Sequence, residues 1–258
     1  MKEFLGIGGY TRDAEGYLSW QHLAFVTALV AVMALLAVFL GRKYKTADET
    51  RKNRVLVWAA LLIDGFELFK ITVFCIRGDG ISEVLYNLPL FLCSIQLITI
   101  PLAAFSKGRV KEASLDFVCI FGLLGAILGT YAAGNNYAAY PVLSLDNVVS
   151  GITHCISGFV ALYIFISGMT GMKKDNMVIT FGILLVFCMA AYLVNIHSDC
   201  NYMFLMRGDG TPYDILYNLT GGHRAFYPLS VVALFLIYIV GFYKVYYLVA
   251  GRKKQPAV

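Results

Sequence analysis

Seven long apolar runs, separated by short polar segments, organise the chain. Each run is close to the ~20 residues that a helix needs to cross a hydrocarbon core of ~30 Å. The runs are continuously apolar and lack the alternation of apolar and polar residues that membrane β-strands show. In lipid, backbone N–H and C=O groups must form their hydrogen bonds within the segment, so the pattern predicts helices. The runs are Ser19–Gly41, Val55–Ile76, Val84–Phe105, Leu115–Ala133, Val148–Met169, Met177–Ile196 and Tyr227–Ala250.

The composition places these helices in a membrane. Of the 258 residues, 59% are hydrophobic and 14% are charged, against about 25% charged in a typical soluble domain. A chain this apolar has too little polar surface to cover a soluble globule, so the sequence predicts an all-α, polytopic integral membrane protein. The net charge of +5 is then explained by basic residues that set the orientation in the membrane and contact lipid headgroups. We expect no nucleic-acid partner, because no basic patch is interleaved with exposed aromatic residues.

The distribution of Lys and Arg predicts the orientation of the bundle. Fourteen of them lie in one alternate set of loops and in the C-terminal tail, and five lie in the other set. Because basic residues stay on the cytoplasmic side, the N-terminus is expected outside and the C-terminus inside. We predict a single domain in a bacterial cytoplasmic membrane, with an outer segment at 1–18, a seven-helix bundle at 19–250 and a basic cytoplasmic tail at 251–258.

Several polar side chains lie within the apolar runs, where they are costly and usually mark a cavity or a pathway. At 1.5 Å per residue, Cys93 and Glu67 lie ~13 Å from the outer ends of their runs, and His154 lies ~9 Å from its outer end. Four further polar residues are expected nearer the outer rim, namely His22, Asp146, Asn147 and Asn195. The similar depths predict one polar pocket that opens to the outer leaflet.

A charged stripe marks the second run. Asp64, Glu67 and Lys70 follow one another at a spacing of three residues, which places them on one side of a helix. A Glu67–Lys70 pair would neutralise both charges and leave Asp64 for a neighbour. The stripe is compatible with an ion pair that holds helices together and with a proton or ion site.

Two residues in this predicted pocket have nucleophilic or basic chemistry. Small and hydroxyl residues recur on the helical face of His154, which lets a partner helix approach closely. Cys93 and Gln96 share a face three residues apart, and Pro89 weakens the turn before them because it donates no N–H. From spacing alone, a packed histidine bonded to a serine and a cysteine that only fills space remain open alternatives.

The six cysteines carry no metal or redox motif. Neither a CxxC pair nor a metal-type spacing occurs, so we expect no metal site and no cofactor. Cys75 and Cys200 are expected near the same membrane face, which leaves a bridge between them open. Membrane cysteines are otherwise small apolar residues in the packing.

Short motifs in the chain resemble a known family. Leu88–Ile95, which reads Leu-Pro-Leu-Phe-Leu-Cys-Ser-Ile, is similar to the signature helix of YwaF-type bacterial integral membrane proteins. Asn201–Leu205 in the last outer loop and His154, on a helix that runs on to Tyr163, add to this resemblance. It extends from about the second run to the seventh. Phe91 departs from it, because many relatives are expected to carry a histidine there.

YwaF-type proteins look similar to the transmembrane protein 164 family, whose members are read as lipid acyltransferases with a cysteine and a histidine on separate helices. The resemblance implies that Cys93 is the nucleophile and His154 the base of an acyltransferase or esterase. Acyl chains of a membrane phospholipid or lysophospholipid would pass through an acyl-thioester. Gln96 is the candidate donor to the oxyanion. One of Asp146, Asn147 and Asn195 would orient the imidazole. Glu67 and Asp64 would line the same pocket.

Two other classes of protein remain compatible with the residues. A small-molecule transporter or permease component would use Asp64, Glu67 and Lys70 together with His154 as a substrate or proton site. A membrane receptor or scaffold without chemistry is also compatible with seven helices. Reactivity of Cys93 separates the enzyme from both alternatives, because neither of them needs a nucleophile.

Overall fold

A computed structural model of the protein describes residues 1–78, 80–170 and 172–252. The chain is helical, and no strand occurs within these ranges. Its contacts divide it into two compact units, Met1–Thr170 and Gly171–Val258.

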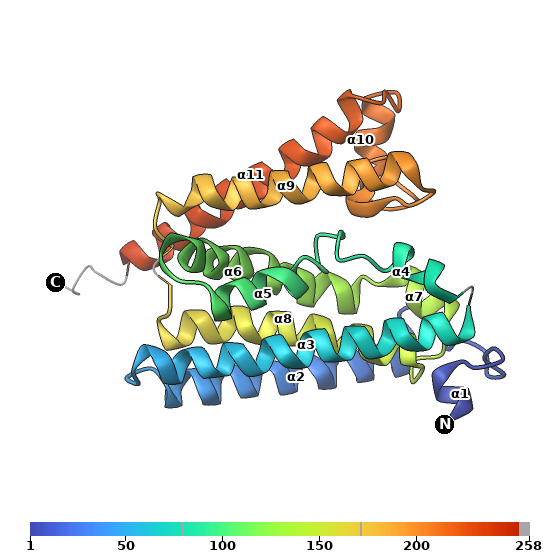
Figure 1. The fold of residues 1–258 in the computed structure, drawn as a ribbon, viewed down its shortest axis with the longest axis horizontal. Coiled ribbons are helices and arrows are strands. Elements are labelled where there is room, and N and C mark those ends of the chain that lie inside the picture. The colour runs from blue at the N-terminus through green and yellow to red at the C-terminus, as the bar shows by residue number, and fades with distance from the viewer. Residues whose placement is uncertain (79, 171, 253–258) are drawn as a thin grey trace. The chain divides into compact units, whose positions relative to one another are not determined.

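Four long helices build the first unit. They are α2 (Trp20–Lys43), α3 (Glu49–Arg77), α6 (Gly108–Tyr131) and α8 (Leu145–Ser167). The helix α8 lies at the centre, since α2, α3 and α6 all pack against it (Figure 1). The shorter elements are α1 (Lys2–Leu5), η1 (Gly80–Ser82), α4 (Glu83–Tyr86), α5 (Gln96–Phe105), which packs against α3 and α6, and α7 (Gly134–Ala139).

The ends of the long helices follow from local sequence. Ser19 caps α2 and Asp48 caps α3, the latter accepting a hydrogen bond from Arg51 N at 2.9 Å. Ser144 caps α8 in the same way, because a short side-chain oxygen satisfies an N–H group that the first turn leaves unpaired. At the other end of α8, Gly168 adopts φ 72°, the left-handed conformation that glycine favours at a helix C-terminus.

The protein is a multi-pass membrane protein. Among the described residues, 5 helices are long and apolar enough to span a membrane. They are Trp20–Lys43, Gly108–Ala139, Leu145–Ser167, Asn176–His197 and Phe226–Val249. The helix α3 is longer, with 29 residues, but the charges of Asp64, Glu67 and Lys70 interrupt its apolar stretch, so it is not one of the five.

The third apolar run is not the continuous helix that its composition predicted. The helix α4 ends at Tyr86, and α5 begins at Gln96 and has 10 residues, which is ~15 Å, or half of a ~30 Å core. Pro89 lies in the irregular segment between them, where it cannot donate a backbone hydrogen bond. Cys93 therefore lies just before a short helix, in a turn that Ile95 N closes on Phe91 O at 3.0 Å, and not within a spanning helix.

The second unit contains α9 (Asn176–His197) and α11 (Phe226–Arg252), which pack together. The segment between them folds into η2 (Tyr202–Phe204) and α10 (Asp214–Leu219). Asn195 fastens it, because its Nδ2 donates to Tyr202 O at 3.0 Å and its Oδ1 accepts from Tyr202 N at 2.8 Å. Asn195 is thus a structural anchor of this loop.

Two other expectations concern cysteines and the tail. Cys75 and Cys200 carry free thiols, as do the other four cysteines, and all six lie in the part of the chain that the structure describes. Cys75 belongs to the first unit and Cys200 to the second, so a bridge between them stays a prediction from the sequence. Of the predicted basic tail at 251–258, residues 253–258 lie outside the described residues.

Candidate functional site

Cys93 is half-buried, just before the short helix α5, and lies close to an imidazole. Its thiol is within interaction range of the side chain of His154, which α8 carries. The backbone N–H groups of Cys93 and Ser94 also point to the sulfur. These N–H groups are free for the sulfur because they precede the first full turn of α5, where intrahelical acceptors are missing. A thiol, an imidazole and two N–H donors thus meet at one point.

The backbone of α8 fixes the orientation of His154. Its Nδ1 lies 2.7 Å from the carbonyl oxygen of Ser150, one helical turn earlier, and the Ser150 hydroxyl lies 3.5 Å away. A carbonyl oxygen can only accept, so Nδ1 carries the proton and donates it to this bond. The lone pair of Nε2 is then available to accept a proton from the thiol. The imidazole is also half-buried, so a ligand can reach it.

Glycines on α6 make room for both side chains. A β-carbon on Gly125 would lie 3.6 Å from Cys93 Cβ, an ordinary contact. A β-carbon on Gly129 would lie 1.9 Å from Cδ2 and 2.1 Å from Nε2 of His154, which is impossible without moving the ring. The sequence reasoning did not single out these glycines. Their spacing, four residues apart on one face of an apolar helix, is the signal that could have found them.

Gln96 supplies a free donor about one turn after Cys93. The residue is fully buried, and its Oε1 accepts a hydrogen bond from Thr99 Oγ1 at 3.0 Å. Its Nε2 has no hydrogen-bond partner among the described residues. A buried amide N–H without a partner is costly, so such a group calls for an explanation. Because Gln96 lies one turn from Cys93, its free amide could stabilise a negative charge that develops during a reaction at the thiol.

The charged stripe of α3 forms the ion pair considered from the sequence. Lys70 Nζ lies 2.7 Å from Glu67 Oε1, and both side chains are largely buried. Asp64 is close enough to Glu67 for their charges to interact. Lys70 in turn lies within electrostatic range of His154. Of this stripe, Lys70 is therefore the residue that acts on the imidazole electrostatically.

Asp146 belongs to a separate cluster. Its Oδ2 accepts hydrogen bonds from Arg77 Nη1 at 2.9 Å and from Tyr10 OH at 2.5 Å, and Arg77 Nη2 binds its other oxygen. Arg77 Nη1 also donates to Leu5 O at 3.2 Å. Burial, and then the hydrogen bond to Asp146, raise the pKa of the Tyr10 phenol. Asp146 thus ties the N-terminal segment to the end of α3.

The asparagines proposed to orient the imidazole have other partners. Asn147 Nδ2 donates to the carbonyl oxygens of Tyr140 and Pro141, each at 3.0 Å. Asn195 is bonded within the second unit, as described above. The Nδ1 partner of His154 is the Ser150 carbonyl instead. Among the described residues, no group of three or more His, Cys, Asp or Glu side chains is placed to hold a metal ion.

These observations define a class: a helical, multi-pass membrane protein with a half-buried thiol–imidazole contact between an interrupted helix and a spanning one. The chain matches the TMEM164 family over residues 17–246, and it belongs to that family. No curated protein and no solved structure matches the chain. The match covers Cys93, His154 and both α6 glycines.

Proposed function

We propose that this TMEM164 family protein is a membrane lipid acyltransferase or esterase, with Cys93 as nucleophile and His154 as base. The observation that carries the proposal is the proximity of thiol and imidazole, together with the Ser150 carbonyl that holds the proton on Nδ1. A nucleophile, a base and a third group that orients the base form the general arrangement of covalent catalysis. Here a backbone carbonyl serves as that third group.

The first half-reaction transfers an acyl chain to the enzyme. His154 Nε2 takes the proton of the Cys93 thiol, and the sulfur attacks the ester carbonyl carbon of a phospholipid. When the tetrahedral intermediate collapses, the ester C–O bond breaks and the imidazolium gives its proton to the leaving alkoxide. The products are a lysophospholipid and an acyl-thioester on Cys93.

The second half-reaction releases the acyl chain. A hydroxyl group of an acceptor lysophospholipid, or water, enters where the first product left. His154 removes its proton, the oxygen attacks the thioester carbonyl, and the thiolate leaves and is protonated again. A lipid acceptor makes the protein a transferase, and water makes it a hydrolase.

Free N–H donors near the sulfur support this chemistry. Both tetrahedral intermediates carry a negative oxygen, and donors that already point to its position stabilise it more than flexible ones do. Gln96 Nε2 is buried and has no partner among the described residues, so it is available to bind this oxygen. The backbone N–H groups of Cys93 and Ser94 are further candidates, because the thiolate sulfur gives up charge as the new bond forms.

The interruption of the third apolar run supports access by lipid. Ester carbonyls of phospholipids lie just below the headgroups, so the nucleophile has to be exposed at that depth. The segment before α5 presents a half-buried thiol partway along a run that a continuous helix would fill. With the N-terminus outside, as the positive-inside pattern predicts, the site opens to the outer leaflet of a bacterial cytoplasmic membrane.

Acyl transfer in proteoliposomes tests this function. The purified protein is reconstituted with a phospholipid that carries a labelled acyl chain and with an unlabelled lysophospholipid. We expect labelled chains on the acceptor or as free fatty acid, and we expect Cys93→Ala to abolish both. Cys75→Ala is the matched control, because Cys75 is another half-buried free cysteine of the same unit. Activity that survives Cys93→Ala contradicts the proposal.

A transporter that uses the charged stripe is the alternative. Lys70 borders His154 and pairs with Glu67, so the stripe could form part of a substrate or proton site. A transporter would lose function in Glu67→Gln and keep it in Cys93→Ala. The acyltransferase shows the opposite dependence on Cys93, so one pair of variants distinguishes the two. A receptor or scaffold would tolerate Cys93→Ala and show no acyl transfer.

A further inference from the structure

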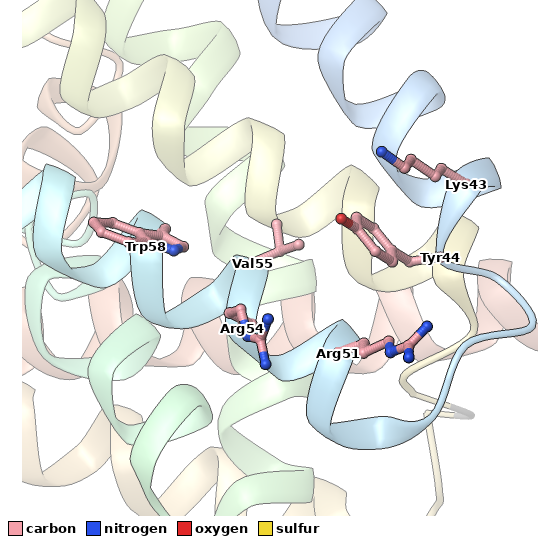
Figure 2. A pocket seen from close by; sticks show the side chains of 6 residues that line it. All are labelled: Lys43, Tyr44, Arg51, Arg54, Val55 and Trp58. Carbon is pink, nitrogen blue, oxygen red and sulfur yellow. The ribbon is translucent and has the colours of Figure 1, made fainter.

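A cationic cavity lies where α2 passes into α3. It has a volume of about 440 Å³. Three of the side chains that line it are basic, and two of the others are the amphipathic aromatics Tyr44 and Trp58 (Figure 2). Its lining consists of Lys43, Tyr44, Arg51, Arg54, Val55 and Trp58. Because the cavity is open and three of its six lining side chains are cationic, it is suited to an anion.

The positive charge of this cavity is only partly compensated. Arg51 Nε lies 3.3 Å from Asp48 Oδ2, but both side chains are exposed, so this pair is weak. Lys43 Nζ lies over the ring of Tyr44, 5.5 Å from its centroid. Arg54 has no ion pair among the described residues. At least two cations therefore remain available to a ligand.

An apolar groove continues from the cationic cavity. It also measures about 440 Å³, and it lies between α2 and α3 on the surface of α8. Val55 and Trp58 line both cavities, so the two are contiguous. Along α2 the groove extends from Leu40 to Leu29, which is ~17 Å at 1.5 Å per residue. That is close to one leaflet of a ~30 Å hydrocarbon core.

We propose that the two cavities form one binding site for an anionic phospholipid, separate from the site at Cys93. The headgroup phosphate occupies the cationic cavity, and an acyl chain lies in the groove between α2 and α3. Arginine forks bind phosphate oxygens in pairs, and basic pockets at the cytoplasmic ends of membrane helices are suited to anionic headgroups. Trp58 and Tyr44 lie at the junction, as aromatics do at a membrane interface.

This site lies on the opposite side of α8 from His154. The imidazole packs on Gly129 of α6, whereas Ile156, two residues further along α8, lines the groove. Two residues correspond to ~200° of rotation in a helix of 3.6 residues per turn. A lipid in the groove is therefore not the substrate bound at Cys93, and the proposal stands whether or not Cys93 is a nucleophile.

Trp58 reports on this site directly. The chain has two tryptophans, so Trp20→Phe leaves Trp58 as the only one. In proteoliposomes of this variant, phosphatidylglycerol and phosphatidylcholine with brominated acyl chains quench a tryptophan that they contact. We expect brominated phosphatidylglycerol to quench Trp58 at a mole fraction about tenfold lower than brominated phosphatidylcholine needs, because the cavity adds attraction for the anionic headgroup to the apolar contact. Equal quenching by the two lipids overturns the proposal.

Matched charge variants show which residues cause the preference for phosphatidylglycerol over phosphatidylcholine. Arg51→Gln with Arg54→Gln should bring the two lipids within about twofold of one another, because each basic residue near the surface contributes to headgroup attraction. Arg42→Gln with Lys45→Gln removes the same charge from exposed neighbours that do not line the cavity, and it should keep the preference. If both pairs lose it equally, general surface charge and not the cavity is responsible. Relief of quenching by millimolar inorganic phosphate would assign the cavity to a soluble anion and overturn the lipid proposal.

A second measurement tests the groove. Native mass spectrometry of the detergent-purified full chain should show one retained phosphatidylglycerol molecule. Leu36→Trp fills the groove and should remove the lipid, whereas Leu35→Trp, on the neighbouring exposed position outside the groove, should retain it. Cys93→Ala should also retain it. Equal retention in Leu36→Trp and Leu35→Trp contradicts the assignment.

Discussion

The imidazole of His154 lies on Gly129 so closely that a β-carbon there would be 1.9 Å from its Cδ2. Gly129→Ala should therefore displace the ring from Cys93 and abolish acyl transfer, at a cost in stability of about 1–3 kcal/mol for overpacking. Gly125→Ala places its methyl group 3.6 Å from Cys93 Cβ and should keep the activity. Transfer assays with both variants check this. Similar activity in the two would mean that the imidazole position does not matter.

His154 should control the reactivity of Cys93. His154→Gln removes the base, so alkylation of Cys93 by iodoacetamide should slow by about 10²-fold or more. The matched control is His197→Gln, since His197 is exposed at the end of α9. Peptide mass spectrometry after timed labelling measures both rates. Unchanged alkylation in His154→Gln would show that the imidazole does not activate the thiol.

Gln96 should act on the transition state and not on the thiol. Gln96→Leu removes a donor that has no partner among the described residues, and Thr99 Oγ1, which loses Gln96 Oε1, keeps Ile95 O as an acceptor, so stability should fall by only about 1 kcal/mol. Acyl transfer should fall by about 10²–10³-fold, as it does when an oxyanion donor is lost. Alkylation of Cys93 should be unchanged. A large loss of stability with proportional loss of alkylation would indicate a purely structural role.

The Arg77–Asp146 pair should anchor the N-terminal segment. Asp146→Asn leaves a buried guanidinium without its charge partner, so unfolding should become easier by about 3 kcal/mol. Asp13→Asn changes an exposed carboxylate and should have little effect. Thermal unfolding in detergent compares the two. Equal unfolding temperatures would contradict the anchoring role.

Tyr10 should make this anchor sensitive to alkaline pH. Its folded-state pKa is raised, by burial first and then by its bond to Asp146, so the folded state holds the phenol proton more tightly than the unfolded state. The stabilisation is complete below the unfolded value of about 10 and is lost as the pH rises through the folded pKa. The stability advantage over Tyr10→Phe should therefore be largest near neutral pH. An advantage that stays constant into the alkaline range would contradict this.

The membrane class follows from patterns that a sequence displays, and the same patterns led to the prediction that Cys93 and His154 share a pocket. Apolar runs identify the spanning helices, and polar residues at similar depth indicate a shared pocket. The interruption of the third run was missed, because hydropathy counts apolar residues and not backbone hydrogen bonds. Pro89 was the one residue in the sequence that indicated this interruption. Asp116 was missed as well: it lies buried in α6 and accepts a hydrogen bond from Thr170.

Partners of polar residues are set by tertiary packing, which spacing alone does not determine. Asp146 was grouped with the imidazole by depth, but Arg77 and Tyr10 converge on it from segments far apart in the sequence. Asn195 was grouped in the same way and instead fastens its own loop. The Ser150 carbonyl could have been anticipated, because a histidine one turn later on a helix can reach it.

Trapping the acyl-enzyme tests the central claim most directly. The protein in liposomes with acyl-labelled phospholipid is quenched in acid during turnover, digested and analysed by mass spectrometry. The account predicts that the Cys93 peptide carries the acyl chain, that hydroxylamine releases it as a thioester, and that His154→Gln lowers its formation. Steady acyl transfer with no acyl group on Cys93, or with the acyl group on another residue, would contradict the account.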